Sequence, residues 1–160
     1  MEFYVDGGCR GNGTSNAIGA AACVMRLRHG DTETWTRDLP NGYYDPLPTN
    51  QRAEITAIIL ALEIALEKYD KLNRRPWLDV TIKSDSRYAV NCMTEWVYKW
   101  STNGWINAKG GEVVNRDLIQ KASDLDDRLK EEGDVQYVWI PRGDNMDADD
   151  ACNDALDEQN

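Results

Sequence analysis

Positive charge is scarce in this chain of 160 residues. The chain has 18 lysine and arginine residues against 28 aspartate and glutamate residues, which gives a formal net charge of −10. This balance argues against a partner that is held through a broadly basic face. The acidity is equally compatible with a high-salt environment or with solubility alone.

Histidine is nearly absent, and the cysteines are few and dispersed. The only histidine, His29, lies in a predicted hairpin turn, far along the chain from every candidate nucleophile, so catalytic Ser-His-Asp and Cys-His arrangements are not expected. The four cysteines contain no C-x-x-C pair, which argues against a zinc site, and they do not suggest a disulfide framework. We therefore expect reduced thiols and an intracellular protein, with the cytoplasm and the nucleus both left open.

Long apolar segments are missing as well. The longest one, residues 55–66, contains Thr56 and Glu63 and is too short to cross a membrane. The N-terminus begins directly with MEFYVD and lacks the basic and apolar regions of a signal peptide. No repeat or low-complexity linker is visible. We therefore expect a single domain over residues 1–160, with no membrane partner.

The pattern of apolar residues and turn residues predicts an α/β order. Strands are expected at residues 2–5, 17–28, 31–39, 77–85 and 135–140. Helices are expected at residues 51–72, 86–100, 116–130 and 146–159. Thr49 or Asn50 can cap the first helix, and Asn115 can cap the third. Three strands, a helix, a strand, helices, a strand and a helix predict an α/β layer fold.

The segment FYVDGGCRGNG places Asp6 at the end of the first predicted strand, before a glycine-rich loop. A phosphate-binding loop needs its glycines between a strand and a helix, whereas these glycines lead into another strand and fit neither common spacing. Asp85 ends the fourth predicted strand. Strand ends border the ligand crevice of α/β sheets, although each aspartate could equally be a turn residue or a helix cap.

Glu54 is the most informative acidic residue of the first predicted helix. At about 100° per residue, it shares a face with Ala57, Ile58, Ala61 and Ala65, and it therefore points toward the sheet. Glu63 and Glu67 lie on the opposite side as ordinary solvated residues. A buried carboxylate must be protonated, paired with a basic side chain or bound to a cation.

Several carboxylates that converge without a lysine repel one another, and a hard divalent cation relieves that repulsion. Mg²⁺ prefers oxygen ligands and accepts substrate phosphates in its shell. Two such ions about 4 Å apart can stabilise the attacking and the leaving oxygen of a phosphoryl displacement. The acidic residues of this chain are therefore compatible with metal-dependent phosphoryl chemistry.

Five segments, in order, give the chain a resemblance to the type 1 ribonuclease H family, in particular to its eukaryotic cellular form. They are YVDGGCRGNG, TNQRAEITAIILAL, IKSDSRYAVNCMTEWVYKW, NGWINAKGGEVVNRDL and NMDADDACNDAL. The resemblance implies a five-stranded mixed sheet, with three antiparallel strands plus two parallel ones, flanked by helices. It also implies endonucleolytic cleavage of the RNA strand of RNA/DNA hybrids by two-metal-ion catalysis, which leaves 5′-phosphate and 3′-hydroxyl ends.

The resemblance also carries over site residues. Asp6, Glu54 and Asp85 match three catalytic, metal-binding carboxylates, and Asp149 matches the fourth because Ala148-Asp149 follows Asn145 at the family spacing; Asp150 is the competing candidate, turned about 100° away. The cofactor implied is Mg²⁺, as two ions, with Mn²⁺ as the alternative. The residues expected to contact nucleic acid are Cys9, Asn12, Thr49, Asn50, Gln51, Tyr88, Trp96, Trp100 and Asn115. Trp100 and Trp105 are alternatively packing residues, and the glycines after Asp6 are expected to let the nucleic-acid backbone approach.

The chain departs from the family pattern in three places. The loop IPRGDN lacks the histidine that many members carry before the last aspartate, and Arg142 cannot act as a base near neutral pH. The projecting segment YKWSTNGWINAKGGE supplies only Lys99 and Lys109. Leu47 stands where the resemblance leads us to expect an arginine in a pocket for a DNA phosphate, of which Thr49 and Asn115 are two other members. We expect slower turnover or a different metal optimum, together with weak hybrid binding.

Two alternatives from other functional classes stay open at this point. The chain could be a catalytically silent module that keeps the fold and binds nucleic acid or protein, although its carboxylates are in place. It could also be the ribonuclease H domain of a reverse transcriptase, or a related nuclease that acts on DNA, although TNQRAE and NGW are typical of cellular forms. For the main interpretation, the expected partner is an RNA/DNA hybrid and the expected state is a monomer.

Overall fold

One five-stranded sheet organises the computed structural model, which describes residues 1–159. The strands are β1 (Glu2–Arg10), β2 (Ile18–Arg26), β3 (Thr32–Asp38), β4 (Leu78–Ser84) and β5 (Gly133–Trp139). Their order across the sheet is β3-β2-β1-β4-β5. The β1–β2 and β2–β3 pairs are antiparallel, and the β1–β4 and β4–β5 pairs are parallel. The predicted mixed sheet is confirmed.

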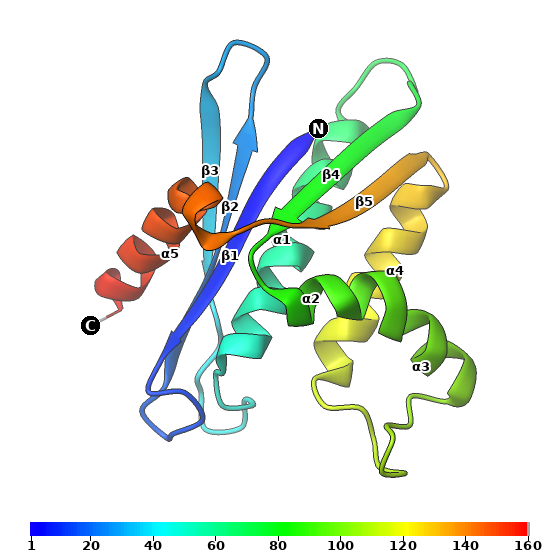
Figure 1. The fold of residues 1–160 in the computed structure, drawn as a ribbon. Coiled ribbons are helices and arrows are strands. Elements are labelled where there is room, and N and C mark those ends of the chain that lie inside the picture. The colour runs from blue at the N-terminus through cyan, green and yellow to red at the C-terminus, as the bar shows by residue number, and fades with distance from the viewer. Residues whose placement is uncertain (160) are drawn as a thin grey trace.

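Helices cover the two faces of the sheet to different extents (Figure 1). The helices α1 (Asn50–Asp70) and α4 (Arg116–Lys130) lie behind the sheet, and α5 (Met146–Glu158) lies over the opposite face of β1–β3. Phe3, Val5, Ile58, Leu62 and Ile82 are fully buried in the core between α1 and the sheet. A smaller cluster, formed by β2 and α5, buries Ala20, Ala22, Cys152, Ala155 and Leu156.

α1 is buried on nearly every side because the sheet lies on one flank and α4 on the other. The prediction that its second face is solvated is therefore wrong in part. Thr56 is buried and donates its hydroxyl hydrogen bond to the carbonyl of Arg52. Glu63 is half-buried and pairs with Arg37 at 2.7 Å and with Lys121 at 3.4 Å. The positive charges of Arg37 and Lys121 thus compensate Glu63, which helical spacing alone predicts to be solvent-exposed.

The predicted helix at residues 86–100 forms, but it is neither uniform nor complete at Trp100. It consists of α2 (Arg87–Asn91), a π-helical turn (Cys92–Trp96) and α3 (Val97–Asn103). A π-helical turn accommodates one extra residue without ending the helix. Gly104 then ends it in a left-handed conformation, with φ of 80°. This path keeps Tyr88, Trp96 and Trp100 in one row, with successive ring centroids 6.1 Å and 5.8 Å apart.

Candidate metal centre and nucleic-acid interface

Asp6 lies inside β1, which corrects the prediction that the strand stops at Val5. β1 continues through Gly7 and Gly8 to Arg10, paired residue by residue with β2. The parallel pairing of β1 with β4, however, stops at Val5 and Ser84. Asp6 and Asp85 are the next residues on their two strands, so both carboxylates lie where the strands part. The crevice is therefore the gap that opens between β1 and β4 after Val5 and Ser84, while β1 itself continues past it to Arg10.

Gly7 brings Glu54 to these aspartates. A Cβ atom on Gly7 would lie 2.2 Å from the backbone carbon of Ala53, so only glycine lets the first turn of α1 cross β1 at this distance. The Gly7 amide donates a hydrogen bond of 3.1 Å to Glu54 Oε2. The first glycine after Asp6 therefore packs against the protein's own helix, and Gly8 faces Leu156 and Cys152 of α5. Gly7 is thus required by the protein's own packing, and the approach of a nucleic-acid backbone to the glycines after Asp6 stays a prediction.

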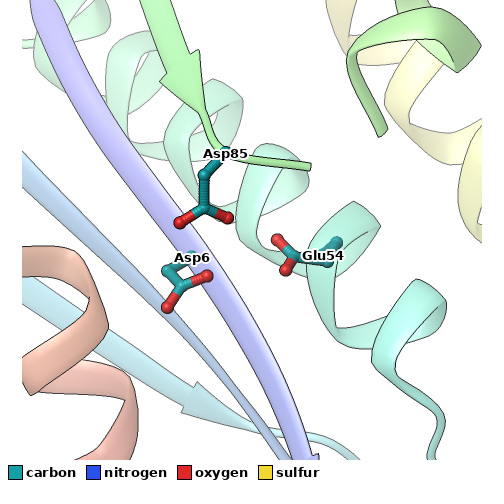
Figure 2. A group of neighbouring side chains, drawn as sticks. All are labelled: Asp6, Glu54 and Asp85. Atoms are coloured by element: carbon teal, nitrogen blue, oxygen red, sulfur yellow. The ribbon is translucent and has the colours of Figure 1, made fainter. Parts of the chain in front are cut away.

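The structure brings Asp6, Glu54 and Asp85 together in one cluster. One carboxylate oxygen from each lies within 4.8 Å of the others, and Figure 2 shows the three groups turned toward one another from β1, α1 and the end of β4. Asp6 is buried, whereas Glu54 and Asp85 are half-buried. Within residues 1–159, no lysine or arginine makes an ion pair with any of the three. Their mutual repulsion is therefore left for another cation to relieve.

The electrostatics of the cluster favour a bound divalent cation. Burial, the Asp85 charge and Asp149 together raise the pKa of Asp6 to about 8. Burial and the charges of Asp6 and Asp85 raise the pKa of Glu54 well above its ordinary value, and the Gly7 amide and Arg142 oppose that rise only in part. Oxygen ligands without a competing lysine are the donor set that Mg²⁺ and Mn²⁺ accept. The residues present thus fit a divalent metal.

Asp149 lies next to Asp6 on the first turns of α5. A hydrogen bond between the two side chains contributes to the raised pKa of Asp6, which places them in contact. Asp149 is half-buried, whereas Asp150 is exposed, as the helical register predicts. Asp149 stands outside the closest group of three. Four carboxylates from β1, α1, the end of β4 and α5 therefore border one site.

Asn145 has a structural role that its sequence spacing to Asp149 did not by itself indicate. Its side chain is buried, and its Nδ2 donates to the Val5 carbonyl at 2.9 Å and to Asp85 Oδ2 at 3.3 Å. Asn145 also precedes the first residue of α5, and its carbonyl accepts a bond from the Asp149 amide. One amide side chain therefore joins β1, the end of β4 and the start of α5. The fixed interval between Asn145 and Asp149 was the signal that could have indicated this role.

The loop before α5 contains a short 3₁₀ helix, Arg142–Asp144. Arg142 lowers the pKa of Glu54 through its charge, so it faces the carboxylate cluster at longer range. His29 is exposed in the turn between β2 and β3. The sequence-based expectation that no histidine serves the site agrees with this placement. Trp139, at the end of β5, donates its indole hydrogen bond to the Asp85 carbonyl at 3.1 Å, a contact that no sequence pattern indicated.

The residues expected to contact nucleic acid lie in two groups beside the cluster. One surrounds the start of α1: Asn12 Oδ1 accepts the Asn50 amide at 2.7 Å, Thr49 caps the helix, and the Cys9 thiol lies 3.4 Å from the Pro48 carbonyl. The other joins α1 to α2 and α4. There Asn115 Nδ2 donates to Tyr88 Oη at 3.1 Å and to Gln51 Oε1 at 3.4 Å.

Asn115 does not cap α4 with its side chain, contrary to expectation. Its backbone is left-handed, with φ of 63°, and its amide serves this second group instead. Trp96 and Trp100 are partly exposed and pack against the core, so the packing interpretation of Trp100 is confirmed. Contact of Trp96 and Trp100 with nucleic acid stays a prediction. Trp105 is buried and is a packing residue. Leu47 is exposed.

A mixed β3-β2-β1-β4-β5 sheet with clustered carboxylates at its central strands defines the class of ribonuclease H-like folds. Residues 1–157 match the RNase H family model, and the chain belongs to the RNase H family. It is 35% identical over 162 residues to the ribonuclease H of Hydrogenovibrio crunogenus, across 99% of this chain and 96% of that protein. It is 34% identical over 163 residues to the ribonuclease H of Halorhodospira halophila, across 99% and 93%.

Solved structures show the same similarity. The crystal structure of LC11-RNase H1 in complex with an RNA/DNA hybrid superposes with a TM-score of 0.68 at 25% identity, and the match covers 99% of this chain and 97% of that one. The RNase H1 of the halophilic archaeon Halobacterium salinarum gives a TM-score of 0.61 at 25% identity, across 98% and 97%. The chain is thus an enzyme of the ribonuclease H type. No helix within residues 1–159 has the length and apolarity needed to cross a bilayer.

Proposed function

We propose that this protein cleaves the RNA strand of RNA/DNA hybrids internally, at the site formed by Asp6, Glu54, Asp85 and Asp149. The observation that carries the proposal is the group of three carboxylate oxygens within 4.8 Å of one another, with no basic partner among residues 1–159. Family membership and the hybrid bound to LC11-RNase H1 support the choice of substrate.

Asp6 and Asp85 are the groups that would hold a metal most directly, because they face each other across the gap between β1 and β4. Glu54 and Asp149 would complete the ligand set from opposite sides, from α1 and α5. Two bound Mg²⁺ ions, or Mn²⁺ in their place, would supply Lewis-acid stabilisation to the attacking and leaving oxygens. The proposed reaction adds water to phosphorus and breaks the bond to O3′, which leaves a 3′-hydroxyl and a 5′-phosphate.

The residues around the start of α1 and around Asn115 would bind the hybrid and orient it. Glu54 lies between the metal-binding aspartates and the start of α1, and a 2′-hydroxyl within its reach would distinguish RNA from DNA. The row of Tyr88, Trp96 and Trp100 would lie along the DNA strand. We further propose that one chain is sufficient, because all four carboxylates come from the same chain, and gel filtration tests the expected monomer.

End-labelled RNA tests the proposal in three forms: paired with DNA, paired with RNA, and single-stranded. Each form is incubated with Mg²⁺, with Mn²⁺ or with EDTA. We expect internal cleavage of the hybrid alone, dependent on metal and lost in Asp85→Asn. Asp70→Asn, at the far end of α1, is the matched control and keeps wild-type cleavage. Hybrid binding without cleavage in either metal would favour the silent binding module, and cleavage of DNA would favour the related nuclease.

A further inference from the structure

Arg52 connects the two groups of expected substrate contacts, because it bonds to Thr49 of the first group and to Asn115 of the second. Its guanidinium makes two hydrogen bonds to Asp117, Nη1 to Oδ1 at 2.9 Å and Nη2 to Oδ2 at 2.7 Å. The Arg52 side chain is only 13% exposed, whereas that of Asp117 is 59% exposed. A two-pronged bond of this kind fixes the plane of the guanidinium as well as its position.

Arg52 supplies hydrogen bonds to two residues of the expected phosphate pocket. Its backbone amide donates to Thr49 Oγ1 at 3.1 Å, and its Nη1 donates to Asn115 Oδ1 at 3.4 Å. An arginine side chain has donors and no acceptor, so the atom of the Asn115 amide that faces it must be the oxygen. The Asn115 NH₂ group is thereby turned toward Tyr88 and Gln51, on the side of the expected substrate contacts.

This arrangement leaves the Thr49 hydroxyl donor free and one Asn115 donor in a long bond. Asn115 Nδ2 donates to Tyr88 Oη at 3.1 Å and to Gln51 Oε1 at 3.4 Å, and a phosphate oxygen would replace Gln51 as the acceptor of the longer bond. Thr49 Oγ1 accepts from the Arg52 amide, so its hydroxyl proton is free to donate elsewhere. Tyr88 Oη accepts from Asn115, and burial raises the pKa of Tyr88 to about 12, which keeps the phenol protonated. A phosphate oxygen is an acceptor only, and neutral donors that converge on it can bind it without a cation. Leu47 provides no positive charge to this pocket, and the charge of Arg52 is already paired with Asp117.

We propose that Arg52, held by Asp117, is a positioning residue that orients Thr49 and Asn115 as hydrogen-bond donors toward a phosphate of the DNA strand. The inference rests on the proposed function, since it assumes that Thr49 of the first group and Asn115 of the second contact the hybrid. The ion pair then keeps the Asn115 amide in one orientation, because a flipped amide would turn its oxygen toward the phosphate and repel it. Asp117 acts indirectly, because it fixes the Arg52 guanidinium, which in turn orients the Asn115 amide.

Hybrids with a single neutral methylphosphonate linkage test the proposal, with the linkage moved stepwise along the DNA strand. Dissociation constants are measured by fluorescence anisotropy in Ca²⁺, and cleavage is measured separately in Mg²⁺. For the wild type we expect one linkage at which neutralisation weakens binding roughly tenfold, the loss typical of a hydrogen bond to a charged group. Arg52→Met keeps the length of the side chain and removes its donors. It should bind the unmodified hybrid roughly tenfold more weakly and should no longer respond to that linkage.

Further variants separate positioning from general stability. Arg52→Lys keeps a donor opposite Asn115 Oδ1 and should restore part of the response to the sensitive linkage. Asp117→Asn should lose part of it, which keeps the test available if Arg52→Met unfolds. Arg128→Met removes a similar arginine-aspartate contact with Asp70, 3.3 Å long and remote from the group, and should leave the response intact. Thermal unfolding is recorded for every variant.

The outcomes are distinguishable. An undiminished response of Arg52→Met to the linkage would overturn the inference, as would a wild type that cleaves hybrids but shows no sensitive linkage. A wild type that does not cleave hybrids at all would instead contradict the proposed function. A loss that appears in KM and in the dissociation constant, with a much smaller change in kcat, is the pattern expected of a residue that positions binding groups.

Discussion

At the scale of single residues, the site depends on two residues that do no chemistry themselves. Gly7 permits α1 to cross β1 closely enough for Glu54 to reach the aspartates, and Asn145 joins Asp85 to the Val5 carbonyl. Neither role could be read from residue type. The sequence indicated Glu54 because its charge conflicts with a buried position, whereas a glycine or an asparagine creates no such conflict.

The first prediction concerns Gly7→Ala. The new Cβ would overlap the backbone of Ala53, so either α1 or β1 must shift, and we expect a loss in the free energy of unfolding of about 3 kcal/mol or more, with loss of activity. Urea unfolding measures the loss. Gly143→Ala is the matched control, because a Cβ there meets nothing within 4 Å. Equal stability of the two variants would show that α1 does not need this close approach.

The second prediction concerns Asn145→Ala. The buried Val5 carbonyl would lose its donor, which should lower the free energy of unfolding by about 1–3 kcal/mol. Asp85 would lose its tether, so kcat should fall and the Mg²⁺ concentration needed for half-maximal activity should rise. Asn153→Ala, an exposed asparagine on the same helix, serves as the control. An unchanged metal requirement in a folded Asn145→Ala protein would contradict the positioning of Asp85.

At the scale of elements, periodicity predicted the type and order of strands and helices well, and failed where tertiary contacts decide the boundaries. β1 extends past its apolar run because β2 pairs with it through the glycines. The π-helical turn and the buried second side of α1 depend on neighbouring elements, which local pattern does not reveal. Of the candidate site, the four carboxylates were predicted, through the family resemblance. The Arg52–Asp117 contact, between residues far apart along the chain, was not predicted.

The third prediction belongs to the projecting segment at residues 98–112, which contains Trp100, the last residue of the aromatic row. Only Lys99 and Lys109 are positively charged there, so few phosphates are neutralised, and log K should fall shallowly with log salt. Glu112→Lys should tighten hybrid binding at low salt and should steepen the slope by up to about 1. Glu131→Lys, an exposed change of the same charge beyond α4, is the control. A steep wild-type slope would contradict this account of the segment.

At the scale of the whole molecule, the carboxylate cluster couples stability to pH and to metal. Asp6 has its folded-state pKa raised from 3.8 to about 8, and the pKa of Glu54 is raised as well. The folded protein therefore holds protons that the unfolded chain releases. For a raised pKa, the stabilising contribution is complete below about pH 4 and is lost as pH rises through about 8. The carboxylate cluster thus makes the metal-free protein more stable at acidic pH than at alkaline pH.

The fourth prediction follows from this coupling. In EDTA, the contribution of Asp6 to the free energy of unfolding should decrease between pH 5 and pH 8, so Asp6→Asn should gain stability relative to the wild type over that interval. Mg²⁺ should raise the melting temperature of the wild type more at pH 8 than at pH 5, because it binds the ionised carboxylates. Calorimetry over a pH series measures both effects. Parallel pH profiles for the wild type and Asp6→Asn would contradict the raised pKa.

The early end of the β1–β4 pairing makes the middle strand of the sheet an edge strand along half of its length. Beyond Val5, within the described residues, β1 pairs with β2 alone, and its other side faces α1. Free strand edges invite pairing with another chain. Here Glu54 accepts the Gly7 amide, and the close approach of Ala53 leaves no room for another strand. The first turn of α1 therefore also shields this internal edge from aggregation.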